Sequence, residues 1–278
     1  MKFLILGDTH AHLKIINTII DEHPEVDAVL QCGDFGIWNV EDFDRWNYII
    51  DPKKHHYVFN TMAPFSDVVE GYLTFNRIVI FITGNHENFD YRDSIDWIKI
   101  MNERNVIWLQ QNELFDLGEP KNKRINIYGL NGCYSYKVYT GDYQKRKKIK
   151  VKPETPPYIE EYLNQVMGRD PRGRFTKKDV DKLKKQKSDI LLLHEVPMGL
   201  FNSGDLPIKQ KPGCSPINEL IEKMQPRFAF CGHFHKYGKM KIGKTKVISL
   251  PEALKGCGIL DTKDWSFKFY KRGEKHVR

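Results

Sequence analysis

The chain has 278 residues, of which 40% are hydrophobic and 29% are charged, and its formal net charge is +8. This composition is typical of a soluble globular protein, and the length suits one large α/β domain or a domain carrying an insertion. No apolar run approaches the roughly 20 residues of a membrane span, and the N-terminus enters a strand-like segment rather than a signal peptide.

The five cysteines are odd in number and scattered, and they form no C-x-x-C pair. This pattern argues against a disulfide framework or a zinc–cysteine site and fits a reducing compartment, so we expect a cytoplasmic protein. Cys32 and Cys231 close apolar segments, which predicts small core residues rather than reactive thiols.

The N-terminal residues predict a β-α-β unit. An apolar strand over 2–6 is followed by Asp8-Thr9-His10. Apolar positions within 13–20 suit one face of a helix, and a second strand over 28–32 ends in Gly33-Asp34. Each strand therefore carries a carboxylate just beyond its carboxyl end.

The next part of the chain contains the third predicted strand. Residues 35–75 are aromatic-rich and are interpreted as helices and loops that cover the ends of these strands. The strand over 78–82 is followed by Gly84-Asn85-His86-Glu87. A helix is predicted over 91–103, with three residues at core spacing: Ile95, Ile98 and Met101.

The remaining regular elements are predicted to be mostly short strands. They cover 106–108, 114–117, 125–129, 190–193, 227–231, 239–242, 245–250, 258–260 and 266–270, with a helix over 217–224. The strand over 190–193 ends on His194. The strand over 227–231 ends on Gly232-His233-Phe234-His235.

The segment 134–187 interrupts this pattern and is interpreted as a basic insertion or flap within a single domain, 1–278. Residues 144–187 hold 15 Lys and Arg against 6 Asp and Glu, so the rest of the chain sums to −1. One interpretation is a solvated surface helix and loop, which the run 177–187 fits. The other is a flap that holds a polyanion, in which the run from Lys145 to Lys152 meets phosphates and Tyr136, Tyr139 or Tyr143 stacks on bases. The candidate substrate contacts in this run are Lys145, Arg146, Lys147 and Lys148.

Five predicted strands thus end in side chains able to bind metal. A lone histidine or aspartate at such a position is usually structural. Five such ends together favour a metal centre, and carboxylate, amide and imidazole donors without thiolate suit Mn, Fe or Zn. Two ions that share a carboxylate would activate a water and clamp a phosphate.

The ordered blocks resemble the calcineurin-like metallophosphoesterase superfamily, whose pattern is D-x-H, G-D, G-N-H-E/D, H and G-H-x-H. The resemblance implies an α/β fold, a four-layer α-β-β-α sandwich with the metals at its centre. It assigns Asp8, His10, Asp34 and His235 to one ion, and Asp34, Asn85, His194 and His233 to the other. In this family, the histidine matching His86 is not a ligand but stabilises the phosphate's charge or protonates the leaving oxygen. We expect Glu87 to brace the loop.

The second half resembles the RNA lariat debranching enzymes. It has a similar turn at 129–134, an inserted segment, a His-acidic-x-Pro block at 194–197 and a helix with the pattern of 213–220. One departure is Asp8, where many debranching enzymes carry Cys. Phosphoprotein phosphatases carry Asp-Arg-Gly after the second block, whereas this chain continues Gly33-Asp34-Phe35-Gly36. This difference disfavours the phosphoprotein phosphatase branch of the superfamily.

The expected function is a binuclear metal-dependent phosphoesterase that attacks phosphorus with a metal-bound hydroxide. Two divalent ions are expected as cofactors, manganese first, with Fe, Zn, Ni, Co and Mg open. A phosphodiesterase acting on nucleotides, RNA or DNA is favoured. The alternatives are a phosphomonoesterase acting on small or protein substrates, and a metal-free scaffold on the same fold. Arg92 is a candidate phosphate contact, with a helix-start salt bridge as its alternative. No membrane partner is expected, and oligomeric state is left open.

Overall fold

The computed structural model describes residues 1–41, 59–117, 124–141, 170–202, 204 and 212–272, and within them the strands form two six-stranded sheets. The first sheet has the order β12-β11-β1-β2-β3-β4. Its strands are β1 (Lys2–Leu6), β2 (Ala28–Gln31), β3 (Ile78–Phe81), β4 (Val106–Trp108), β11 (Gly256–Asp261) and β12 (Ser266–Lys271). β1 to β4 run parallel, whereas β11 and β12 are antiparallel to their neighbours.

The second sheet has the order β5-β6-β7-β8-β10-β9. Its strands are β5 (Leu114–Leu117), β6 (Ile125–Leu130), β7 (Ile190–Leu193), β8 (Phe228–Cys231), β9 (Gly238–Ile242) and β10 (Thr245–Ser249). β6, β7, β8 and β10 are parallel, and an antiparallel strand flanks them on each side. Both sheets are therefore mixed, and the sequence-predicted strands are present in them.

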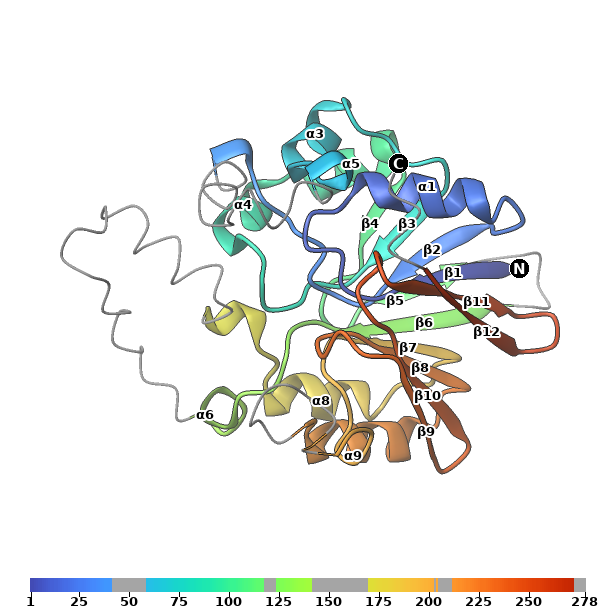
Figure 1. The fold of residues 1–278 in the computed structure, drawn as a ribbon. Coiled ribbons are helices and arrows are strands. Elements are labelled where there is room, and N and C mark those ends of the chain that lie inside the picture. The colour runs from blue at the N-terminus through green and yellow to red at the C-terminus, as the bar shows by residue number, and fades with distance from the viewer. Residues whose placement is uncertain (42–58, 118–123, 142–169, 203, 205–211, 273–278) are drawn as a thin grey trace.

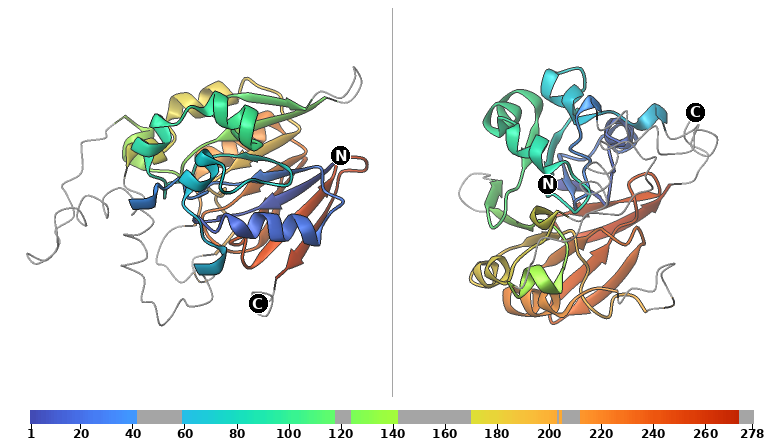
Figure 2. Two further views of the ribbon diagram at one scale, coloured as in Figure 1. Left: turned by 90° about the horizontal axis from the view of Figure 1, so that it is seen from above. Right: turned by 90° about the vertical axis from the view of Figure 1, so that its left-hand side faces the viewer.

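Helices cover the outer face of each sheet. α1 (Lys14–Glu22), α3 (Phe65–Glu70), α4 (Phe89–Ser94) and α5 (Trp97–Arg104) belong with the first sheet, and α8 (Lys177–Leu183) and α9 (Ser215–Met224) with the second. Figure 1 shows α1, α3 and α5 above the paired sheets and α8 and α9 below them, and Figure 2 shows the same separation from the side. The order of layers is helix, sheet, sheet, helix. Short elements complete the fold: η1 (Phe59–Thr61), α6 (Tyr136–Tyr139) and η3 (Pro171–Gly173).

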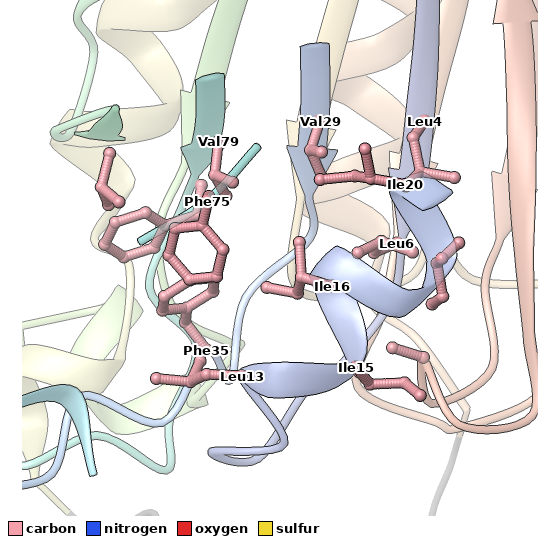
Figure 3. Close-up of a cluster of buried hydrophobic side chains, with 14 of the residues drawn as sticks. Leu4, Leu6, Leu13, Ile15, Ile16, Ile20, Val29, Phe35, Phe75 and Val79 are labelled. Atoms are coloured by element: carbon pink, nitrogen blue, oxygen red, sulfur yellow. The ribbon is translucent and has the colours of Figure 1, made fainter. Parts of the chain in front are cut away.

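Three apolar clusters fill the spaces between these layers. Alternate residues of the parallel strands face opposite sides, so Leu4 packs toward α1 and Ile5 packs between the sheets. On the helix side, Ile16 and Ile20 of α1 lie against Leu4 and Val29 (Figure 3). The central strands are buried on both faces, which explains why they read as continuous apolar runs.

The sheet topology brings the motif loops together. β1, β2 and β3 are adjacent and parallel, so the loops that follow them lie together at the carboxyl ends of these strands. β7 and β8 are also adjacent and parallel, and the loops that follow them lie together in the same way in the second sheet. Candidate ligands from both sets of loops lie within 4.8 Å of one another, so the carboxyl ends of the strands of both sheets meet at one place.

The structure corrects the predicted helix over 91–103. Two helices, α4 and α5, occupy this region, because Asp96 leaves helical geometry and caps α5 by accepting a hydrogen bond from the Lys99 backbone N–H. Ile98 is 72% exposed and Met101 45% exposed, so both were wrongly assigned to the core. The break resets the helical phase, and Ile100 is buried instead.

The basic insertion is described only at its ends. α6 follows Tyr134, and residues 170–187 include η3 and α8, whereas 142–169 lie outside the described residues. Within the run 177–187, α8 is a helix with Val180 and Leu183 buried and its other side chains more exposed, as in the first of the two interpretations. No helix in the described part of the chain is long and apolar enough to cross a membrane.

Candidate metal centre

Two groups of ligand side chains gather where the strand-end loops meet. One group is Asp8, His10, Asp34 and His235, and the other is Asp34, His194 and His233. Within each group, one ligand atom from every residue lies within 4.8 Å of the others. Asp34 belongs to both groups.

In the first group, four side chains point toward one centre. His235 Nε2 lies 2.8 Å from Asp8 Oδ2 and 3.1 Å from His10 Nε2. His10 Nε2 is also 3.8 Å from Asp34 Oδ2. Two imidazole nitrogens and two carboxylates therefore face one another, an arrangement that a cation would stabilise.

The second group is more deeply buried. His194 Nε2 lies 3.3 Å from Asp34 Oδ2 and 3.1 Å from Asn85 Oδ1, while its Nδ1 is 3.0 Å from the Cys32 carbonyl oxygen. The Nδ1–H donates to that carbonyl, so Nε2 is the ring nitrogen that faces Asn85 and Asp34. The predicted amide ligand thus lies beside the predicted imidazole ligand.

Asp34 is held by the loop that follows β3. Its Oδ1 accepts hydrogen bonds from the backbone N–H groups of Asn85, at 2.7 Å, and His86, at 2.8 Å. Its Oδ2 faces His10 and His194. One oxygen is therefore used to orient the carboxylate, and the other lies between the two groups.

Four of the candidate ligands have left-handed backbone conformations. The φ angles are 44° at His10, 50° at Asp34, 68° at His233 and 52° at His235. Such conformations cost of order 1–3 kcal/mol each for residues other than glycine, and they persist only where the surroundings fix them. Here, the Asp34 carbonyl oxygen accepts the His10 N–H at 2.8 Å. These sharp turns bring side chains from several strands to one centre.

Glu87 braces this region, as expected. Its carboxylate accepts hydrogen bonds from three consecutive backbone N–H groups, those of Phe35, Gly36 and Ile37, at 2.8–2.9 Å, and the side chain is fully buried. Burial raises the pKa of Glu87, and the nearby Asp34 raises it further, although the three N–H donors oppose this. The carboxylate joins the loop after β2 to the loop after β3 and lies outside both ligand groups.

The charge states favour cation binding at some ligands and require proton release at others. Burial lowers the pKa of His10 and of His233, so both imidazoles are neutral near pH 7. Burial opposes charge on Asp34, but His194 and His86 outweigh it and hold the pKa of Asp34 well below its usual value. Burial also lowers the pKa of His194, but Asp34 outweighs it and raises that pKa to about 9. Binding of an ion at the His194 Nε2 would therefore require the loss of a proton.

These donors fit a pair of divalent ions. Asp8 and Asp34 are each only 1% exposed, and a buried carboxylate pair at the centre of four imidazoles needs positive charge. The donors are oxygen and imidazole nitrogen, which suit borderline divalent metals.

The other sequence-predicted residues are placed as follows. The His86 ring lies 5.6 Å from the His10 ring between centroids, beside the first group. Arg92 is buried, pairs with Asp93 at 2.6 Å, and stacks over the Phe89 and Trp108 rings. These are contacts of the helix-start salt bridge that the sequence left as the alternative. Four residues, Lys145, Arg146, Lys147 and Lys148, lie outside the described residues.

Sequence reasoning missed two carboxylates next to the ligands. Glu252 Oε1 lies 3.1 Å from His235 Nδ1, and Glu195 Oε2 lies 3.9 Å from His233 Nε2. Glu195 stands inside the His-acidic-x-Pro block, which could have indicated a role near the site. Glu252 follows β10 in an ordinary turn, and no sequence signal marks it.

Comparison with known proteins identifies related chains. A family model for calcineurin-like phosphoesterases matches residues 1–237. The lariat debranching enzyme of Arabidopsis thaliana is 28% identical over 258 residues, covering 84% of this chain and 54% of that protein. The enzyme of the same name from Drosophila pseudoobscura pseudoobscura is 26% identical, covering 84% of this chain and 42% of that protein. The chain therefore spans about half the length of these curated relatives.

Among solved structures, TT1561 of Thermus thermophilus superposes with a TM-score of 0.53. It covers 100% of this chain and 99% of that chain, at 12% sequence identity. At this identity, the match concerns the fold alone.

Proposed function

The chain belongs to the calcineurin-like phosphoesterase family, a family of metal-dependent phosphoesterases, and from this premise we propose that it is a phosphodiesterase acting on nucleotides or nucleic acids. The observation that carries the proposal is the pair of ligand groups joined at Asp34, with His86 beside one of them. We propose that Asp8, His10, Asp34 and His235 hold one divalent ion, and that Asp34, Asn85, His194 and His233 hold the other.

Two ions held by these residues would supply Lewis acidity and lower the pKa of a bound water. The chain's own contribution is to orient and protonate. The His86 backbone N–H donates to Asp34, which fixes its position relative to the ligands. Its imidazole is partly exposed beside His10, so it can donate a hydrogen bond to a phosphate oxygen or a proton to the leaving oxygen.

The diester preference is supported by the ends of the basic segment. Gly173 approaches so closely that a Cβ there would lie 3.0 Å from the Asn85 Cα. Cys133, just before the segment, and Arg174, within it, form an isolated parallel bridge. The chain therefore enters the segment and passes Gly173 and Arg174 close to the loop that carries Asn85, where positive charge would attract a polyanion. The similarity to lariat debranching enzymes over most of the chain supports the same substrate class.

The proposed contacts with a nucleotide or nucleic-acid substrate lie mostly in the basic segment. Lys145 to Lys148 are proposed to meet phosphates. Tyr136 is 66% exposed on α6, at the start of the segment, and is proposed as a stacking surface for a base. Arg92 is a weaker candidate, because its guanidinium already contacts Asp93 and two rings.

A metal-by-substrate panel tests the proposal. The purified protein is stripped of metal with a chelator. Separate samples are then reloaded with Mn²⁺, Fe²⁺, Zn²⁺, Ni²⁺, Co²⁺ or Mg²⁺, and each sample is assayed on five substrates. These are a chromogenic monoester, a chromogenic diester, cyclic nucleotides, 2′,5′-linked RNA and linear oligonucleotides. We expect metal-dependent turnover, highest on diesters. Turnover on the monoester alone would favour a phosphomonoesterase, and neither metal nor turnover would favour a scaffold.

His86→Ala should keep both ions yet lose about 10²- to 10⁴-fold in turnover, because it removes a proton donor and no ligand. Metal content by atomic emission is measured beside kcat. His23→Ala is the matched control, since the partly buried His23 contacts Glu25 and Tyr270 and belongs to neither ligand group. Loss of metal in His86→Ala would show that the division of roles within residues 84–87 is wrong.

Replacing Lys145, Arg146, Lys147 and Lys148 together with Ala should slow cleavage of oligonucleotides at low salt and leave the chromogenic diester unaffected. The salt dependence of oligonucleotide cleavage should also decrease, because fewer counterions are released on binding. Equal losses on both substrates would exclude the proposed contact with polyanions.

A further inference from the structure

A second carboxylate contacts His235 on the side opposite Asp8. Glu252 Oε1 lies 3.1 Å from His235 Nδ1, while His235 Nε2 lies 2.8 Å from Asp8 Oδ2. One ring nitrogen faces the first ligand group, and the other faces a carboxylate outside it. Glu252 lies in none of the family blocks.

The loop that carries Glu252 is fixed to the site at two points. The Ala253 backbone N–H donates to the Asp8 carbonyl oxygen at 2.9 Å. Ser249, at the end of β10, donates its hydroxyl to the Lys236 carbonyl oxygen at 2.9 Å, next to His235. Hydrogen bonds therefore tie the Glu252 loop both to the loop after β1 and to the loop after β8. The other Glu252 oxygen pairs with Lys255.

The His235 ring needs such a restraint. Its backbone has a left-handed φ of 52°, and its side chain is 36% exposed, so packing alone does not fix the ring. A carboxylate that accepts the Nδ1–H selects the tautomer whose Nε2 lone pair is available, and it makes that nitrogen a stronger ligand. The Nε2 is the atom that faces Asp8 and His10.

Glu195 does not provide an equivalent contact to His233. Its Oε2 is 3.9 Å from His233 Nε2, beyond hydrogen-bond distance. Both of its oxygens already accept backbone N–H groups, from Tyr134 at 3.1 Å and Val196 at 3.0 Å. The geometry thus distinguishes Glu252 from the other nearby carboxylate.

We propose that Glu252 is a positioning residue for the ion held by Asp8, His10, Asp34 and His235, acting by accepting the Nδ1–H of His235. The inference rests on the proposed assignment of His235 as a ligand. It predicts that the two ions depend unequally on Glu252: the ion bound through His235 needs it, and the ion bound through His194 does not.

The test measures metal binding without any substrate. Glu252→Ala and Glu252→Gln are stripped with a chelator and titrated with Mn²⁺, and bound metal is followed by equilibrium dialysis and electron paramagnetic resonance. The parent should bind two ions. Glu252→Ala should bind one ion with parent affinity and the other about 10- to 100-fold more weakly. Glu252→Gln should fall between, because the amide oxygen accepts a hydrogen bond but carries no charge. At an intermediate Mn²⁺ concentration, the parent should show the resonance of a spin-coupled pair of ions, whereas Glu252→Ala should show that of an isolated ion.

Two controls isolate the carboxylate. Lys255→Ala removes the other partner of Glu252 and should leave both affinities unchanged. Glu219→Gln makes the same chemical change at a surface glutamate paired with Lys184 and should also change neither. Melting curves in chelator should match across the variants, which excludes misfolding as the cause of a weaker site.

Four outcomes would overturn the inference. Parent-like affinities in both Glu252 variants would remove the positioning role. A Lys255→Ala variant that matches Glu252→Ala would assign the effect to the loop rather than the carboxylate. Two intact ions combined with a shifted pH profile of turnover would make Glu252 part of a proton relay instead. A parent that binds no ion would refute the proposed function as well, so the two failures are distinguishable.

Discussion

The glycine that precedes a ligand block leaves room for a ligand from another block. A Cβ on Gly33 would lie 2.5 Å from His194 Nδ1, and one on Gly84 would lie 2.1 Å from Asp34 Oδ1. A Cβ on Gly232 would lie 2.2 Å from Asp8 Oδ1. These distances are far inside van der Waals contact, so each motif glycine is required by a partner distant in sequence. The sequence alone displays the glycines but not the contacts that require them.

Gly232→Ala should therefore displace the Asp8 carboxylate and lower the affinity for the ion that Asp8 is proposed to bind. We expect a loss of at least about 1–3 kcal/mol in stability from overpacking, together with weaker binding of one ion. Mn²⁺ titration and thermal melting provide the measurements. Gly204→Ala is the control, because a Cβ there meets nothing within 4 Å. Retention of both ions at parent affinity in Gly232→Ala would contradict the packing argument.

Among the secondary-structure elements, α8 shows how local chemistry begins a helix. Thr176 accepts the Asp179 backbone N–H, and Asp179 in turn accepts the Thr176 N–H at 2.8 Å, which forms a capping box. Buried Val180 and Leu183 then attach α8 to the outer face of the second sheet. This arrangement anchors the chain directly after η3, whose Gly173 contacts the Asn85 loop.

Thr176→Ala should destabilise the protein by about 1 kcal/mol, the usual cost of removing a helix N-cap. Chemical denaturation gives the free energy of unfolding. Thr18→Ala, at an exposed position inside α1, should cost little, since alanine favours helices. A Thr176→Ala stability equal to that of the parent would show that the capping box is redundant with the packing of α8.

At the scale of the whole molecule, the ligand groups join the two halves of the sandwich. Asp8, Asp34 and Asn85 follow strands of the first sheet, whereas His194, His233 and His235 follow strands of the second. The apolar layer between the sheets is formed by residues such as Ile5 and Phe230. An ion bound between these loops would therefore bind the folded state and not the unfolded chain.

Divalent metal should accordingly raise the melting temperature, and a chelator should lower it. Above the dissociation constant, each tenfold increase in free metal should add about 1.4 kcal/mol per site, because binding is linked to folding. Melting curves measured across a range of Mn²⁺ concentrations provide the check. A melting temperature that is independent of metal would contradict the proposed centre and favour the scaffold.

The sequence by itself determined the strands and the order of the ligand blocks. Buried parallel strands such as β3 must be continuously apolar, and glycine with polar residues must follow where the chain turns, so both features are visible without coordinates. The pattern failed at α4 and α5, because a capping residue, Asp96, overrode the helical period expected through Ile98. It also could not mark Glu252, whose proposed role depends on a partner 17 positions earlier in the chain.

Only the tertiary structure decided how the blocks form one centre. The left-handed turns at His10, Asp34, His233 and His235 and the bracing by Glu87 depend on contacts between residues far apart in sequence. Local propensity disfavours such conformations for residues other than glycine, so no local pattern predicts them. They are stable because the packing of two sheets fixes the strand ends, and the hydrogen bonds between the loops then determine where each ligand points.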